Sequence, residues 1–359
     1  MTRPMIAAMF GMAVMGSALG SMSVAAADEP TLTIFNWADY LPQDVVDEFE
    51  AKHHVRVVQN YYNSNAEMLA KLQSGGDHQY DLAFPSDYFV PRLIKAGLVQ
   101  PLDGARLTNR SHLLADFRNP SYDPDESYSV PYQWGATGIA YNADALPDLP
   151  PDWHALFDPK ANPTHPFALL KGDGQFTLST ACAYLNKGYD CIGREDWLAA
   201  AKVVGPTLKR ANYVGFVGAT AALDQLARGV IDVGVVYNGD FARKQVEDPE
   251  SFRNIRFFIP REGSQRWVDA MVIPAHAPHP ELAAAFMNYL LTPEVAARVS
   301  NANFYSTPVA DAVPLLKPAL RDSVATPDEQ QRKRLAYTPS LDGQQLQFVQ
   351  QLWTELRSR

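Results

Sequence analysis

Three segments near the start of the chain indicate its fold: LTIFNWADY at residues 32–40, VRVVQNYYNSN at residues 55–65 and DLAFPSDY at residues 81–88. Each begins with a short run of mostly apolar or β-branched residues, which is typical of a buried strand. Apolar residues at helical spacing follow each stretch, at residues 44–52, 64–72 and 88–96. Strands that alternate with helices in this way predict an α/β fold with a parallel sheet.

The ends of these predicted strands carry polar and aromatic residues. Ligands of open parallel sheets bind beyond the carboxyl ends of the strands. Residues 36–40, 63–65 and 85–88 occupy those positions and contain Asn, Trp, Tyr, Ser and Asp. We therefore expect three polar, aromatic-rich loops to meet at one edge of the sheet and to contribute to a binding site.

The first residues have the pattern of a secretory signal peptide. Residues 1–27 carry one charge, Arg3, followed by a short apolar run and by small residues that include Ala25 and Ala27. This pattern predicts cleavage before Asp28 and export to the periplasm. An uncleaved or lipidated leader is the alternative, although no Cys lies near the predicted cleavage site.

The rest of the chain is longer than a single core usually supports and predicts two lobes. Residues 132–140 and 267–273 are extended stretches that we expect to carry the chain between the lobes. We expect lobe 1 to comprise residues 28–136 and 268–310, and lobe 2 to comprise residues 137–267 and 311–359. Further helices are predicted near residues 178–186, 195–204, 221–228, 281–300 and 343–357, and further strands near residues 231–237 and 255–259.

Composition and motifs exclude several classes of function. The chain has 31 basic and 40 acidic residues and a net charge of −9, so it is a poor candidate for binding nucleic acid and is compatible with a cationic ligand. It contains no phosphate-loop pattern, no Gly-x-Ser-x-Gly elbow and no His-Glu-x-x-His motif. We expect a monomeric binding protein without a cofactor or metal, and not an enzyme.

The two cysteines, Cys182 and Cys191, lie close together in the sequence. In an oxidising compartment such a pair can form a disulfide, and two buried thiols are the alternative. Two cysteines without a nearby cluster of His do not make a zinc site. Their role is therefore expected to be structural.

Four strings together resemble the spermidine/putrescine-binding periplasmic proteins of ABC importers. They read FNWADY at residues 35–40, YDLAFPS at 80–86, VPYQWGAT at 130–137 and WVD at 267–269. The resemblance implies a two-lobed, type II periplasmic binding protein with a mixed, mostly parallel sheet in each lobe and a ligand cleft between the lobes. It also implies capture of a linear polyamine by lobe closure and delivery to an inner-membrane permease.

The resemblance implies aromatic side chains for the methylenes of a polyamine and carboxylates for its ammonium groups. Among these residues, Asp269 lies between apolar neighbours in an extended stretch, where an acid should be paired or functional. Any single aromatic residue could instead belong to the core, and Asp39 or Asp87 could instead cap a helix. The implied ligand-binding residues are Trp37, Asp39, Tyr40, Ser86, Tyr88, Asp173, Tyr237, Asp240, Trp267, Asp269 and Tyr305.

Two departures from the family pattern bear on the ligand. Phe176 stands where the family commonly has Glu, which removes one partner for an ammonium group, and Ala38 replaces a hydroxyl residue. Ferric iron is an alternative ligand of two-lobed proteins, but neighbouring residues on a strand, such as Tyr61 and Tyr62, point to opposite faces. The alternative to transport is that the ligand-bound protein binds a membrane signalling receptor and reports the ligand to it.

Overall fold

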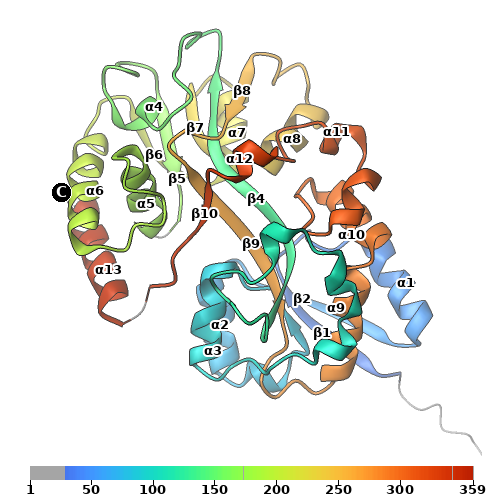
Figure 1. Cartoon of the computed structure of the whole chain (residues 1–359). Coiled ribbons are helices and arrows are strands. Elements are labelled where there is room, and N and C mark those ends of the chain that lie inside the picture. Colours follow the sequence, from blue (N-terminus) through green and yellow to red (C-terminus); the bar gives the residue numbers. More distant parts are fainter. Residues whose placement is uncertain (1–28, 173, 342, 359) are drawn as a thin grey trace, which may run out of the picture.

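The structure is a computed structural model that describes residues 29–172, 174–341 and 343–358. It has two lobes joined by long strands (Figure 1). The predicted signal peptide, residues 1–27, lies outside the described residues. In the part of the chain that the structure describes, no helix is long and apolar enough to cross a membrane.

The first lobe is built on three parallel strands, as the sequence predicts. Strand β1 (Thr31–Asn36) lies between β2 (Arg56–Tyr61) and β3 (Leu82–Ala83). Successive side chains of β1 point to opposite faces, so that Leu32 enters one core and Phe35 enters another. The sheet therefore needs a helical layer on each face.

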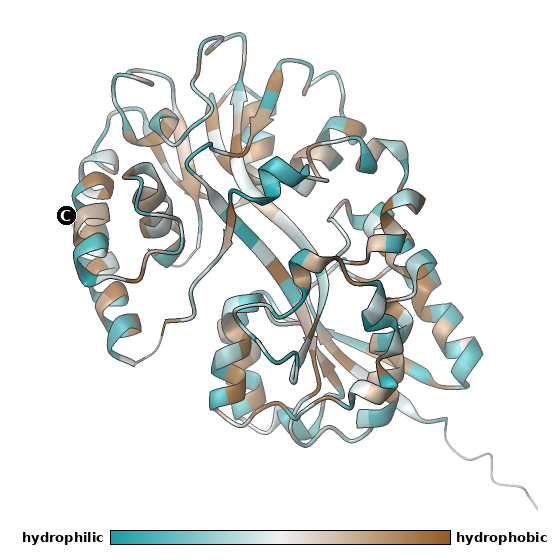
Figure 2. Ribbon diagram, in the orientation of Figure 1, coloured by the Kyte–Doolittle hydropathy of each residue, from teal (hydrophilic) through white to brown (hydrophobic). Residues whose placement is uncertain are grey.

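Helices supply both layers of lobe 1. On one face lie α1 (Gln43–His53), α9 (Pro280–Leu290) and α10 (Pro293–Asn303), whose apolar residues share a core with Leu32. On the other face lie α2 (Asn65–Gln73) and α3 (Val90–Lys95). Figure 2 shows apolar residues gathered on the strands and polar residues along the outer sides of the helices.

The start of α2 fixes a loop at the edge of the sheet. The Ser64 hydroxyl accepts a hydrogen bond from the backbone N–H of Glu67 at 3.1 Å, which is one half of a capping box. The Glu67 carboxylate instead accepts from the backbone N–H of Asn63 at 2.9 Å. The two bonds hold residues 63–65 in one turn beyond the end of β2.

One predicted helix, residues 281–300, is two helices in the structure. Helix α9 ends at Leu290 and α10 begins at Pro293. Proline has no N–H to donate and is favoured in the first turn of a helix, so Pro293 starts a new helix instead of continuing the old one.

Two antiparallel strands join the lobes, and they contain both extended stretches that the sequence predicts, apart from Ile273. Strand β4 (Ser129–Asn142) runs out of lobe 1, and β9 (Ser264–Val272) returns to it (Figure 1). Their register places Gln133 opposite Asp269 and Gly135 opposite Trp267. The short strand β10 (Leu335–Tyr337) pairs with β9 in parallel.

The second lobe continues the sheet from β4. The strands β5 (Phe167–Leu170), β6 (Tyr213–Val217) and β7 (Val233–Tyr237) are parallel to one another where they pair, and β7 and β8 (Ile255–Phe258) pair with β4. Eight of the described strands follow the order β2-β1-β3-β9-β4-β7-β5-β6, and β8 and β10 lie off this path, paired with β4 and β9. Strands β7 and β8 confirm the predicted ones, whereas β5 and β6 were not predicted.

Helices surround the strands of lobe 2 and complete the chain. Four helices correspond to predicted ones, namely α5 (Gly174–Tyr184), α6 (Arg194–Thr207), α7 (Ala219–Ala227) and α13 (Gly343–Ser358), whereas α8 (Asn238–Glu247) was not predicted. The cysteine prediction is confirmed, because a disulfide joins Cys182 in α5 to Cys191 ahead of α6. The remaining described α-helices are α4 (His154–Phe157), α11 (Pro318–Arg321) and α12 (Glu329–Arg332).

Candidate ligand-binding site

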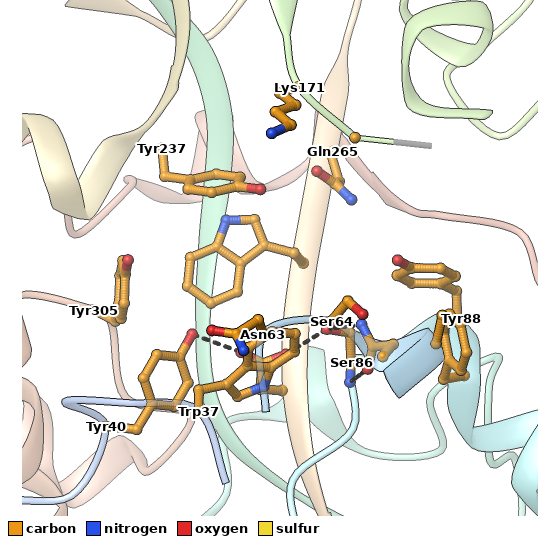
Figure 3. Close-up of a pocket in the computed structure, with 16 residues that line it drawn as sticks. Trp37, Tyr40, Asn63, Ser64, Ser86, Tyr88, Lys171, Tyr237, Gln265 and Tyr305 are labelled. Atoms are coloured by element: carbon orange, nitrogen blue, oxygen red, sulfur yellow. Dashed lines mark hydrogen bonds between the residues drawn. The ribbon is translucent and has the colours of Figure 1, made fainter. Parts of the chain in front are cut away.

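A cavity of about 740 Å³ lies where the two lobes meet. Its walls come from loops after β1, β2 and β3, from β9, and from the ends of β5 and β7, so both lobes contribute. Figure 3 shows Lys171, Tyr237 and Gln265 on one side and Trp37, Tyr40 and Ser86 on the opposite side. The lining residues are Trp37, Tyr40, Asn63, Ser64, Asn65, Ala66, Ser86, Tyr88, Phe89, Lys171, Gly172, Tyr237, Gln265, Trp267, Asp269 and Tyr305.

The buried carboxylate of Asp269 is the main polar group of the cavity. Its side chain is on β9, only 3% of the residue is exposed, and it accepts hydrogen bonds from the hydroxyls of Tyr40 and Ser86, each at 2.7 Å. Burial raises the pKa of Asp269 to about 6, against the two hydrogen bonds, which lower it. No described Lys, Arg or His forms an ion pair with Asp269, so the carboxylate can still accept a cation.

Ser86 is itself held in place by the loop after β2. Its backbone N–H donates to Asn65 Oδ1 at 2.9 Å, and the Asn65 amide donates to the Ser86 hydroxyl at 3.0 Å. With that acceptor role filled, the Ser86 hydroxyl donates its proton to Asp269. The loops after β2 and β3 therefore fix the carboxylate together.

Five aromatic rings follow one another around the carboxylate. Ring centroids are 6.3 Å apart for Trp37 and Tyr40, 5.8 Å for Tyr40 and Tyr305, 4.9 Å for Tyr305 and Trp267, and 5.7 Å for Trp267 and Tyr237. The Trp37 indole N–H donates to the Phe84 carbonyl at 3.0 Å, which fixes the first ring. Such rings can contact an alkyl chain and also attract an ammonium group.

A glycine on the crossing strand makes room for Trp267. A Cβ atom placed on Gly135 would lie 2.3 Å from an indole carbon of Trp267 and 2.8 Å from the side-chain oxygen of Asn238. Only glycine fits there without displacing one of these groups. The register of β4 and β9 thus decides where the indole lies.

Asp240 lies behind the aromatic wall and outside the cavity lining. It is 4% exposed, at the start of α8, and accepts a hydrogen bond from the Tyr305 hydroxyl at 2.7 Å. Arg243 lies 3.7 Å from the same carboxylate. Asp240 therefore positions the ring of Tyr305.

The structure describes two of the other three candidate acids, Asp39 and Asp87. Asp39 is exposed, has a φ of 59° and does not line the cavity. Asp87 is fully buried, and its carboxylate accepts from the backbone N–H groups of Tyr88 and Val268 at 2.6 and 3.2 Å. Neither is the residue at the cap of a helix, since those positions are Pro42 and Ser86. Asp173 lies outside the described residues.

Eight of the implied ligand-binding residues meet at the cavity: Trp37, Tyr40, Ser86, Tyr88, Tyr237, Trp267, Asp269 and Tyr305. The alternation of side chains along β9 could have added Gln265 to this set, because it precedes Trp267 by two positions. Phe176 is 8% exposed and belongs to the core of lobe 2, and it does not line the cavity. Lys171 also lines the cavity and was not predicted to do so, because β5, the strand that it follows, was not predicted.

The two tyrosines considered for iron lie at the end of β2 and have different surroundings. Tyr61 is 53% exposed, whereas Tyr62 is 2% exposed and donates its hydroxyl proton to the Phe84 carbonyl. The two side chains therefore do not form one site.

Two lobes joined by crossing strands, with a cavity lined from both sides, define a solute-binding protein of the type II periplasmic class and not an enzyme. The chain belongs to the bacterial extracellular solute-binding protein family, whose model matches residues 44–327. It is accordingly a periplasmic protein.

Named relatives cover most of the chain. The spermidine/putrescine-binding periplasmic protein of Escherichia coli (strain K12) is 33% identical over 87% of this chain and 87% of its own length. The putrescine-binding periplasmic protein SpuD of Pseudomonas aeruginosa is 31% identical over 93% of each chain. The solved structure of a putative spermidine/putrescine ABC transporter from Listeria monocytogenes is 30% identical, with a TM-score of 0.79, and covers 92% of this chain and 99% of that one.

Proposed function

We propose that this protein captures a linear polyamine of the putrescine and spermidine class in the periplasm. The observation that carries the proposal is the buried carboxylate of Asp269, which faces the cavity with no cation of the described residues paired to it. An ammonium group placed there would stabilise the ionised carboxylate, which burial alone disfavours. A neutral or anionic solute would leave that charge unpaired.

The aromatic residues support a linear alkyl chain next to this carboxylate. Trp37, Tyr305 and Trp267 lie around the same cavity as Asp269. Each ring that meets an ammonium group contributes roughly 0.5–2 kcal/mol, depending on how far water is excluded. We therefore retain Trp37, Tyr40, Ser86, Tyr88, Tyr237, Trp267, Asp269 and Tyr305 as the proposed contact residues.

We further propose that the ligand is delivered to an ABC permease of the inner membrane and that the protein is a monomer. The names of the relatives support transport, because the Listeria structure is named a putative spermidine/putrescine ABC transporter. Nothing in those names supports the signalling alternative. Light scattering of the mature protein tests the monomer, and a stable dimer would contradict it.

We propose one change to the expected lobe boundaries, at the boundary after residue 310. We propose lobe 1 as residues 28–136 with 268–325, and lobe 2 as residues 137–267 with 326–359. The expected boundary after residue 310 is moved because Ala312, Leu316, Leu320 and Ala325 belong to the core that contains α1 and α9. Leu341 and Val349 belong to the core of lobe 2. Limited proteolysis that cut first within residues 312–325 would argue against the amendment.

Titration calorimetry of the mature protein tests the proposed ligand class. The panel contains putrescine, cadaverine and spermidine, together with a neutral sugar and a dicarboxylate of similar length. We expect saturable binding of at least one amine. Binding of the sugar or the dicarboxylate alone would overturn the proposal.

A further inference from the structure

A lysine side chain lies in the cavity at the opposite lobe from Asp269. Lys171 directly follows β5, and its backbone N–H donates to the Val217 carbonyl at 2.9 Å, which fixes the end of the strand. The residue is exposed and lines the cavity. In Figure 3 its ammonium group points toward the region between Tyr237 and Gln265.

The ammonium group of Lys171 forms no ion pair with any carboxylate of residues 29–172, 174–341 and 343–358. Other lysines of the chain do form such pairs, for example Lys187 with Asp196 at 2.5 Å and Lys244 with Asp224 at 2.9 Å. Within the described residues, Asp269 and Lys171 are the two charged side chains that line the cavity. Their charges cancel, so the described lining does not favour a ligand with two cationic ends.

The amide of Gln265 adds a second donor on the side of Lys171. Its oxygen accepts from the Thr137 hydroxyl at 2.7 Å, and one of its N–H groups donates to the Thr338 hydroxyl at 2.9 Å. An amide carries two N–H groups, and the second has no partner among the described residues. This side of the cavity therefore offers hydrogen-bond donors from Lys171 and Gln265. A ligand that pairs with them must carry an acceptor oxygen at that end.

We propose that the site prefers a linear amine with an ammonium group at one end and a carbonyl-type oxygen at the other, such as a mono-N-acylated polyamine. This inference rests on the proposed function, because the ammonium group would occupy the place at Asp269. The oxygen would accept from Lys171 and Gln265. A free second ammonium group would instead be repelled by Lys171 and would leave the Gln265 donor unpaired.

Calorimetric competition among three ligands of similar length tests the inference. Putrescine has two ammonium groups, N-acetylputrescine has one ammonium group and an amide oxygen, and 4-aminobutyrate has one ammonium group and a carboxylate. We expect N-acetylputrescine or 4-aminobutyrate to bind about tenfold tighter than putrescine, and the tighter of the two identifies the kind of oxygen. Putrescine binding as tightly as both, or tighter, overturns the inference and leaves the polyamine function intact, whereas no binding of any amine removes both.

The variant Lys171→Met tests the assigned residue directly. It keeps an unbranched side chain one atom shorter than lysine and removes the charge, so putrescine should bind about tenfold tighter and the two oxygen-bearing ligands should bind more weakly. Lys209→Met is the matched control, because Lys209 is exposed in lobe 2 and does not line the cavity. Equal changes for the three ligands in Lys171→Met, or the same changes in Lys209→Met, would overturn the assignment.

Discussion

Two buried aspartates near the cavity show how their partners decide their roles. Asp87 accepts hydrogen bonds from two backbone N–H groups, so its carboxylate joins the loop after β3 to β9. Asp269 accepts from two hydroxyls and faces the cavity. The first carboxylate is satisfied by the fold, whereas the second gains from a ligand cation.

Replacing each aspartate by asparagine separates these roles. Asp269→Asn keeps the shape and removes the charge, so we expect amine binding to weaken at least tenfold, or about 1.4 kcal/mol. Asp87→Asn should leave the affinity nearly unchanged and lower the melting temperature, because an NH2 group, which cannot accept a hydrogen bond, replaces one of its two acceptor oxygens. Titration calorimetry and thermal unfolding of both variants check this, and wild-type affinity in Asp269→Asn would refute the site assignment.

The raised pKa of Asp269 also predicts how pH acts on binding. Its pKa is about 6 in the ligand-free protein, so below that value a proton competes with the ligand ammonium group. We expect amine affinity to be constant near about pH 8 and to fall by up to about tenfold for each pH unit below the pKa. Asp269→Asn should remove this dependence, and a wild-type affinity that does not change down to about pH 5 would contradict it.

The same residue affects stability in the opposite sense. An acid whose pKa is raised on folding stabilises the fold below its ordinary pKa of 3.8, and this contribution is lost as the pH rises through about 6. Ionised Asp269 therefore opposes folding at neutral pH until a cation binds. The melting temperature of wild type, relative to that of Asp269→Asn, should therefore fall as the pH rises from below 3.8 to above about 6.

At the scale of elements, the two crossing strands decide the geometry of the site. β9 places Gln265, Trp267 and Asp269 on one face by the alternation of a strand, and β4 provides Gly135 opposite Trp267. The wall of the cavity therefore depends on close contact between these strands as well as on the loops.

Gly135→Ala tests this dependence. The new methyl group would overlap the Trp267 ring, so we expect the ring to move, amine affinity to fall several-fold and stability to fall by about 1–3 kcal/mol. Gly104→Ala is the control, because a Cβ atom at Gly104 meets no atom within 4 Å. Calorimetry and denaturant unfolding measure the two effects, and a Gly135→Ala protein indistinguishable from the control would contradict the argument.

Local patterns explain which elements the sequence could predict. The strands and helices of lobe 1 have clear periodicity, and the residues that end β1 and β3 could be assigned to the site from the order of strands alone. The strand β5 has four buried residues and no alternation, so it carries no local signal of its own. Because Lys171 follows β5, its place in the cavity could not be predicted without that strand.

Side-chain direction is the part of the site that local sequence does not contain. Asp240 and Tyr237 lie three positions apart, yet Tyr237 lines the cavity and Asp240 contacts Tyr305 from behind. Asp39 shares a motif with Trp37 and Tyr40, but the turn with positive φ leaves it exposed. These directions depend on contacts with residues far away in the sequence.

At the scale of the whole molecule, the two lobes have separate cores and share one cavity. Lobe 2 has a single core that includes Phe176 and Val349, whereas lobe 1 has one core on each face of its sheet. Lobes with their own cores can move as bodies about the strands that join them. The cavity walls then change their spacing while each wall keeps its internal hydrogen bonds.

Ligand-driven closure of the lobes follows from how the cavity is divided between them. Asp269 and its two hydroxyl partners lie on the side of lobe 1, whereas Lys171 and Tyr237 come from strands of lobe 2. A ligand that contacts both sides stabilises the arrangement in which they are closest, and it shifts the population by its difference in affinity for the open and closed forms. Small-angle X-ray scattering should therefore give a smaller radius of gyration with saturating amine than without it, and Asp269→Asn should show a smaller decrease at the same amine concentration. An unchanged radius in the wild-type protein, at a concentration where calorimetry shows saturation, would mean that binding does not bring the lobes together.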